Sequence, residues 1–156
     1  PSVIVDAYIA AHVAVQDGID LELYRSHLRH TTDPVAATIL KRLVQDKERH
    51  VAFGWVYLTE RAKEWSPAVR AEIVGEIEHV IADLELAGYH CAWLVPGDAA
   101  AEIVAADEAT RAAGLGASSV AEETAVLKQW FAEARTAFAN LGIEPRKFEH
   151  PRLGRL

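Results

Sequence analysis

The chain of 156 residues is 51% hydrophobic and 25% charged, with a formal net charge of −7. These values predict one packed domain and exclude an intrinsically disordered chain, because disorder requires low hydrophobicity together with high net charge. The acidic balance argues against a nucleic-acid partner, since proteins that bind the phosphate backbone carry clustered Lys and Arg. No run reaches the roughly 18 apolar residues of a membrane span, so no membrane partner is expected.

The chain has one cysteine, Cys91, and no methionine. A single cysteine cannot build a disulfide framework, and the first residues lack the basic segment of a signal peptide, so a reducing cytoplasm is the expected location. The missing methionine fits either removal of the initiator before Pro1 or a sequence that begins inside a longer protein. Both explanations remain open.

Two long helices are predicted first. Over residues 3–30, apolar side chains recur three or four positions apart, which is the stripe of an amphipathic helix. A second helix is predicted over 34–64, because the Asp33 side chain can accept from first-turn amides and Pro34 suits the first helical position. The short turn between them predicts that the two helices pack antiparallel.

Three further helices follow from start and stop signals. The pair Ser66-Pro67 begins a third helix, which is expected to end before Pro96. Asp98 can cap a short, alanine-rich fourth helix. Residues 119–122 form a capping box that begins a fifth helix, and Gly142 ends it.

The predicted fold is therefore all-α, an antiparallel helical bundle of about five helices formed by residues 1–143. Residues 144–156 lack an apolar period and contain two prolines, so they are expected to form an irregular C-terminal tail. The tail carries four basic and two acidic residues on an otherwise acidic chain. It is either a solvated end or an arm that lies across an acidic neighbour or partner subunit.

Polar residues interrupt the inward stripes of the two long helices at one level. Lys47 and His50 lie where the spacing in the second helix would place leucines, and Asp46 lies one step to the side. Asp17 interrupts the first helix, and both Asp17 and Lys47 are 15 residues from Thr32 in the turn. Because a buried charge is costly unless it is paired or bound to a metal, this layer is the candidate functional site.

The residues alone allow two interpretations of this layer. Asp17 and Lys47 can form an ion pair that fixes the helix register, with His50 hydrogen-bonded to Asp17 or Asp46. Alternatively, Lys47 and Asp46 are catalytic residues of an acid–base site. No Ser or Cys stands in a recognisable nucleophile setting, so hydrolytic chemistry has little support.

Other candidates are expected to be structural. Glu76 and His79 have the Glu-x-x-His spacing of a metal site, but their polar stripe, which continues to His90, lies opposite the apolar side of the helix and is expected to be solvated. Cys91 is expected on the same helix as a small core residue, and the tryptophans as core or interface residues. Three histidines are expected at the surface or end of the first helix: His12, His27 and His30.

Residues 43–54 resemble the last metal-binding helix of ferritin-like diiron carboxylate proteins, whose pattern is often Asp-Glu-x-Arg-His followed by an apolar residue and Gly. Four residues agree with that pattern: Asp46, Arg49, His50 and Gly54. Asp17 resembles the position where the preceding helix of that family places a bridging Glu. The resemblance covers well under half of the chain. It implies a ferritin-like bundle with Asp17 and His50 as ligands of iron or manganese.

Three departures from the family pattern bear on the metal. Lys47 stands where the family has a Glu ligand, and Asp17 shortens the upstream Glu. A charged lysine has no lone pair for a metal. The family's first helix pair, which carries the other ligands, has no counterpart upstream of Val3. In other ferritin-like branches a lysine in place of this Glu accompanies loss of the metal, so the resemblance implies either iron or manganese, or no metal.

Two classes of function follow from the resemblance. The first is a dioxygen-activating non-haem diiron oxidoreductase, or a degenerate relative, that takes a small apolar substrate and draws further ligands from a second chain. The second is a non-catalytic structural or binding subunit that completes a four-helix bundle with a partner. Both imply a homo- or hetero-oligomer that assembles through the helices at 3–30 and 34–64.

Overall fold

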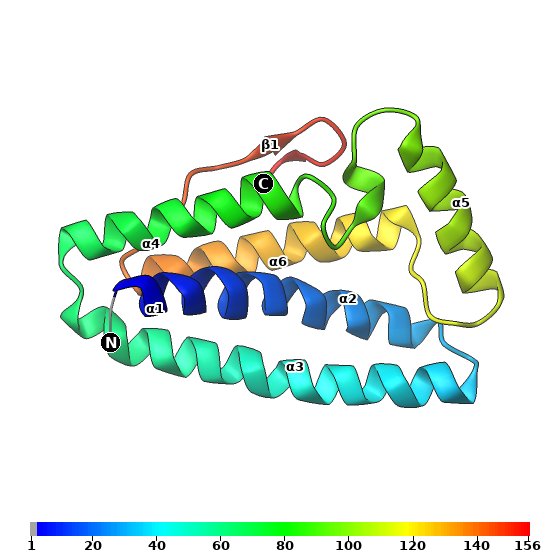
Figure 1. Cartoon of the computed structure of the whole chain (residues 1–156), viewed down its shortest axis with the longest axis horizontal. Helices are drawn as coiled ribbons and strands as arrows, with labels where there is room; N and C mark the ends of the chain where they lie inside the picture. Colours follow the sequence, from blue (N-terminus) through cyan, green and yellow to red (C-terminus); the bar gives the residue numbers. More distant parts are fainter. Residues whose placement is uncertain (1–2) are drawn as a thin grey trace.

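The first helix of the bundle is one continuous rod with a widened middle. A computed structural model describes residues 3–156 (Figure 1). The rod consists of α1 (Val3–Tyr8), the π-helical segment η1 (Ile9–Gln16) and α2 (Asp17–Arg29). These bounds confirm the first predicted helix. The π-helical middle is a feature that the apolar spacing did not indicate.

The second rod is α3 (Pro34–Arg61), extended by the 3-10 turn η2 (Ala62–Glu64). Asp33 begins α3, because its Oδ1 accepts from the amides of Val35 and Ala36 at 2.9 and 2.8 Å. The second predicted helix is confirmed over its full length.

The third rod ends earlier than predicted. α4 (Pro67–His79) continues as the π-helical segment η3 (Val80–Glu85), and a turn then leads to the short 3-10 helix η4 (Ala92–Leu94). Gly88 in that turn has φ +99°, a left-handed conformation that ends a helix and favours glycine. Cys91 therefore lies beyond the helix, although it is buried as expected.

The last two helices are α5 (Ala99–Ala112) and α6 (Val120–Asn140). The predicted capping box is confirmed: Ser119 Oγ accepts from the Glu122 amide, and the Glu122 carboxylate accepts from the Ser119 amide. Asp98 precedes α5, but its side chain makes no capping hydrogen bond.

The four long rods form an antiparallel bundle in which each rod runs opposite to the previous one (Figure 1). The first rod is central, with α3 on one side, α4 on the other and α6 also packed against it. α5 lies at one end of the bundle, in the connection between η4 and α6. The predicted all-α helical bundle is thus confirmed. Within residues 3–156, no helix is long and apolar enough to cross a membrane.

The core lies between the first rod, α4 and α6. Alanines of η1 let the rods approach closely, and larger side chains of α4 and α6 fill the remaining space. Fully buried residues include Ala10, Ala11, Ala14, Ile19, Ile73, Ile77 and Phe138. α3 adds only Gly54 and Leu58 to the buried residues. A Cβ on Gly54 would lie 2.9 Å from Val13 Cγ1, so glycine at this position lets α3 approach η1.

The C-terminal tail packs on its own chain. Three of its side chains are buried: Ile143, Phe148 and Leu153. Within it, β1 (Glu149–His150) pairs antiparallel with β2 (Gly154–Arg155). Arg135 of α6 donates to the carbonyl oxygens of Pro145 and Leu156 at 3.2 and 3.1 Å. The tail is therefore not a solvated end. The apolar residues of the tail follow no helical period, which is why a solvated end was one of the two alternatives from the sequence.

Candidate functional site

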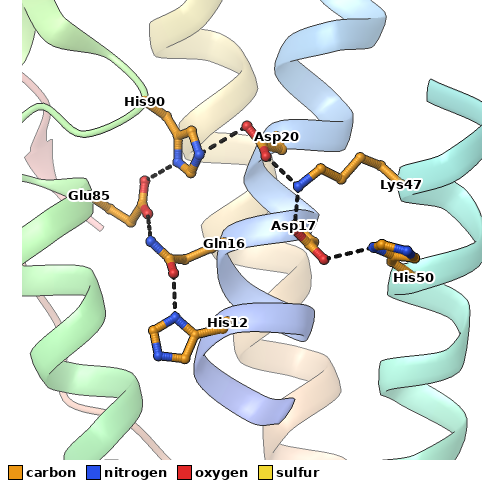
Figure 2. A network of polar contacts seen from close by, with 8 residues as sticks. All are labelled: His12, Gln16, Asp17, Asp20, Lys47, His50, Glu85 and His90. Carbon is orange, nitrogen blue, oxygen red and sulfur yellow. Dashed lines mark hydrogen bonds and ion pairs between the residues drawn. The ribbon is translucent and has the colours of Figure 1, made fainter. Parts of the chain in front are cut away.

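Eight polar residues form one connected network across three parts of the bundle (Figure 2). They come from the first rod, from α3, and from the end of η3 with the turn that follows it. The residues are His12, Gln16, Asp17, Asp20, Lys47, His50, Glu85 and His90. The network therefore contains the layer of Asp17, Lys47 and His50 that the sequence indicated.

The Lys47 ammonium lies between two carboxylates of α2. Its Nζ donates to Asp17 Oδ1 and lies 2.6 Å from Asp20 Oδ2. Burial lowers the pKa of Lys47, but its hydrogen bonds to Asp17 and Asp20 outweigh burial and raise that pKa above its ordinary value. Lys47 is therefore a cation throughout the physiological pH range.

The first turn of α2 presents both carboxylates to α3. Asp17 and Asp20 are three residues apart, so they lie on one face of the helix. Gly18, beside them, packs this turn against α6, where an added Cβ would lie 2.8 Å from Trp130 Nε1. The close approach of α2 to α6 thereby holds this turn, with its two carboxylates, against the core.

His90 is a second cation in the network. Its Nε2 lies 2.9 Å from Asp20 Oδ1, and its Nδ1 lies 2.7 Å from Glu85 Oε2. A carboxylate on each ring nitrogen favours the doubly protonated imidazolium. Burial lowers the pKa of His90, but the hydrogen bonds to Asp20 and Glu85 prevail and raise it to about 9. At neutral pH two cations, Lys47 and His90, therefore face three carboxylates.

Both π-helical segments end at this network. η1 ends at Gln16, immediately before Asp17, and η3 ends at Glu85. Gln16 Nε2 donates to Glu85 Oε1 at 2.9 Å, which joins the two rods directly. His12 Nδ1 lies 2.5 Å from Gln16 Oε1, an oxygen that only accepts, so Nδ1 carries the proton. The wider π-helical turn changes the directions in which neighbouring side chains point, and such turns are frequent at functional sites.

The structure brings together three of the four site residues that the sequence indicated. His50 Nδ1 lies 3.3 Å from Asp17 Oδ2, so Asp17 joins His50 to Lys47. The His50 side chain is 64% exposed and lies at the solvent edge of the network. Asp46 lies apart from the network, because its carboxylate pairs with Arg49 at the exposed surface of α3.

The part of the network that follows α4 was not predicted from the sequence. His90 was expected on a solvated stripe with His79, but the helix ends at Glu85 and the turn at Gly88 returns His90 to α2. The expectation was wrong because it continued the helical period through a helix stop, and Gly88 is the signal that marks that stop. His79 itself is exposed as expected.

The histidines of the first rod are less exposed than expected. His12 belongs to the network. His27 Nδ1 lies 3.0 Å from Ser118 Oγ, and His30 Nε2 lies 2.6 Å from Glu122 Oε1. His27 and His30 therefore join the end of α2 to the start of α6 and serve the fold.

An open pocket of about 220 Å³ gives solvent access to the network. Tyr8 and Tyr89 line it, and their rings pack on those of His12 and His90 with centroids 4.6 Å apart in both pairs. Among the described residues that line it, Val13 is the only one with an aliphatic side chain. The pocket therefore suits a small polar molecule better than an apolar one.

The iron or manganese that the family resemblance implies does not fit these donors. The Lys47 ammonium fills the space between Asp17 and Asp20, and it has no lone pair to offer. His90 binds a carboxylate through each ring nitrogen and has no lone pair left as an imidazolium. Among residues 3–156, no group of three or more His, Cys, Asp or Glu is arranged as a metal site.

The network can perform charge compensation and helix positioning. Lys47 and His90 neutralise carboxylates that would otherwise repel each other, and Asp20 joins the two cations. Because the partners lie on α2, α3 and the turn after η3, the network holds three parts of the bundle at one level. A buried ion pair is by itself weak evidence for added stability, and fixing the register of packed helices is the best attested use of such groups.

Comparisons with protein-family models, with curated proteins and with solved structures found no match to this chain. The resemblance to ferritin-like proteins therefore rests on the sequence of residues 43–54 and on Asp17 alone. A function has to be inferred from the polar network.

Proposed function

We propose that the chain is a non-catalytic helical subunit of ferritin-like ancestry, in which the Lys47 ammonium takes the place of a metal ion. The observation that carries this proposal is the contact of Lys47 Nζ with both Asp17 and Asp20. An ammonium supplies the positive charge that a metal would supply to these carboxylates, but it has neither open coordination positions nor redox chemistry.

The proposed role is to present the helices at 3–30 and 34–64 to a partner chain. The network sets the relative height of these two helices without a bound ligand. The surface that the helices form is therefore in place before a partner binds. Support comes from the contacts of Lys47 with two carboxylates of α2 and from the second bridge that His90 makes to Asp20.

A dioxygen-activating diiron oxidoreductase is the second candidate. It is favoured by the contact between Asp17 and His50, which are the two residues that the family would use as ligands. It requires a metal where Lys47 lies and an apolar substrate in a pocket that is mostly polar, so we rank it below the subunit.

Metal content separates the two functions. Protein purified without chelator should contain less than about 0.1 equivalent of Fe, Mn or Zn per chain by elemental analysis. One equivalent of iron or manganese that is lost in both Asp17→Asn and His50→Ala would overturn the proposed function and favour the oxidoreductase.

Replacement of Lys47 provides a second test. Lys47→Glu should create or strengthen binding of Fe²⁺ or Mn²⁺, because it restores a carboxylate and removes the competing cation. Added Mn²⁺ should therefore raise the Tm of this variant and leave the wild type unchanged. Lys41→Glu, on the exposed side of the same helix, is the control for charge. Equal responses of the two variants to Mn²⁺ would count against a metal-replacing role of Lys47.

A further inference from the structure

α3 has apolar side chains on two opposite sides. Its inner side contacts the bundle through Gly54 and Leu58. On its other side Ile39, Phe53 and Val56 are 56%, 57% and 65% exposed. A surface helix normally confines apolar residues to the side that faces the core, and a helix apolar on both sides belongs between two packed layers.

The exposed residues of α3 follow the spacing of a coiled-coil seam. We define the α3 seam as six residues whose spacing alternates between three and four: Ile39, Arg42, Asp46, Arg49, Phe53 and Val56. This spacing repeats every seven residues and keeps one stripe turned toward a partner helix. All six are exposed or half-exposed, so the seam is accessible along its length.

The seam is complementary to itself when reversed. About a two-fold axis between positions 47 and 48, position 46 falls opposite 49, position 42 opposite 53, and position 39 opposite 56. The central layer then places Asp46 of each copy against Arg49 of the other. A closed two-fold interface requires this reciprocity, in which residue i meets j and j meets i.

We propose that a second copy of this chain docks antiparallel on the α3 seam and forms a two-fold symmetric dimer. This inference rests on the proposed role as a subunit and names its partner. Asp46 and Arg49, which bond to each other within one chain, exchange partners across the axis. Arg42 lies over the Phe53 ring of the second copy, and Ile39 packs against Val56, so both ends of the seam become covered.

Charge selects the antiparallel orientation. In a parallel pair, each seam residue would meet its own copy, so Asp46 would face Asp46 and Arg49 would face Arg49. Like charges at the centre of an interface oppose binding. An unrelated partner would not need a seam that is complementary to its own reversed copy.

Light scattering on the purified chain is the first test. At roughly 50 µM, where a dimer with a Kd of about 1 µM is largely formed, we expect about twice the chain mass of 17.1 kDa. Phe53→Glu should give a monomer with an unchanged Tm in dilute solution. Leu115 is an apolar residue of similar exposure that lies away from the seam, so the Leu115→Glu variant should remain a dimer. A monomeric wild type would overturn the inference.

A charge exchange tests the register. Asp46→Arg and Arg49→Asp should each weaken the dimer by at least about tenfold in Kd, because each puts like charges in the central layer. The double variant should recover most of the affinity, since the exchange restores the complementary layer. Failure of the double variant to recover would overturn the antiparallel pairing.

Cysteine cross-linking tests the orientation independently. Cys91 is buried, so introduced surface thiols react without competition from it. Ile39→Cys combined with Val56→Cys should form a covalent dimer under mild oxidation. Cross-linking of Ile39→Cys alone would indicate parallel packing and would overturn the inference. None of these measurements depends on metal content, so failure of the dimer and failure of the metal-replacing role of Lys47 are distinguishable.

Discussion

Two polar clusters join the first rod to α3, and they differ in how completely they exclude water. Near one end of the bundle, Asp6 of α1 is 1% exposed and accepts from three side chains: Tyr57, Arg61 and Trp65. Nearer the middle, the Lys47 network opens into a pocket of about 220 Å³. Both clusters link the same two helices, but only the second is accessible to a ligand.

The difference assigns different roles to the two clusters. At Asp6, rigid donors from Tyr57, Arg61 and Trp65 satisfy both carboxylate oxygens, so the charge is closed off and can only support the fold. In the Lys47 network, three carboxylates face two cations and the edge residue His50 is largely solvated. Imbalance and exposure together leave that network able to respond to pH or to a partner.

The largest expected effect is the loss of Asp6. Asp6→Ala removes the buried acceptor of the Trp65 indole and of the Tyr57 hydroxyl, so the free energy of unfolding should fall by about 4 kcal/mol. Urea unfolding at pH 7 measures it. Asp83→Ala, which removes an exposed carboxylate, should change the same quantity by less than about 0.5 kcal/mol. Equal effects would contradict the distinction between closed and exposed pairs.

The next effect is a loss of stability at alkaline pH that originates in His90. The pKa of His90 is raised to about 9 in the folded chain, so the folded state holds a proton that the unfolded state releases near pH 6.5. The stabilisation is therefore complete below pH 6.5 and is lost as pH rises through 9, by up to about 3 kcal/mol. Urea midpoints at pH 6 and pH 9.5 measure it. His90→Gln should remove most of this dependence.

The Asp6 cluster responds to pH in the opposite direction. Burial raises the pKa of Asp6, but hydrogen bonds from Arg61, Tyr57 and Trp65 outweigh burial and lower that pKa below its ordinary value. Its contribution is therefore present above pH 4 and is lost only in acid. A slope between pH 6 and 9.5 that persisted in His90→Gln would show that neither cluster accounts for it.

Local signals in the sequence were sufficient for the all-α class and for the starts of three helices. The capping residues Asp33, Ser66 and Ser119 each accept from the amides of the helices that follow them. Such bonds connect residues two or three positions apart, so the sequence contains both partners side by side. The π-helical segments escaped prediction, because the helical periods differ too little over eight residues to be told apart from apolar spacing.

The site was predictable only where helices pair across one turn. Equal distance from Thr32 placed Asp17 beside Lys47, since antiparallel neighbours keep their register over a short connection. Glu85 ends η3, and His90 reaches the network through the helix stop and turn that follow. Their partners Gln16 and Asp20 are about 70 residues away in sequence. No periodicity specifies a contact of that kind.

A smaller effect is expected from the loss of the Lys47 charge. Lys47→Met leaves Asp17 and Asp20 facing each other without the cation between them, so their repulsion should lower stability at pH 7 by about 2 kcal/mol. Part of that loss should return at pH 5, where added protons offset the missing positive charge. Lys41→Met is the control. A pH-independent loss would indicate that lost packing, and not the unpaired carboxylates, is responsible.

The smallest effect on the folded chain distinguishes the two sides of α3. Asp46 is one residue from Lys47, but its pair with Arg49 is exposed, with side chains 46% and 71% accessible. Solvent screens such a pair, so Asp46→Ala should change the stability of the dilute chain by less than about 0.5 kcal/mol. The same substitution should weaken self-association, because Arg49 of each copy then loses its partner across the axis. Urea unfolding in dilute solution and light scattering at higher concentration separate the two quantities. A stability loss comparable to that of Lys47→Met would place Asp46 in the inner network, and the outer side of α3 would lose its charge-specific reason to bind a second copy.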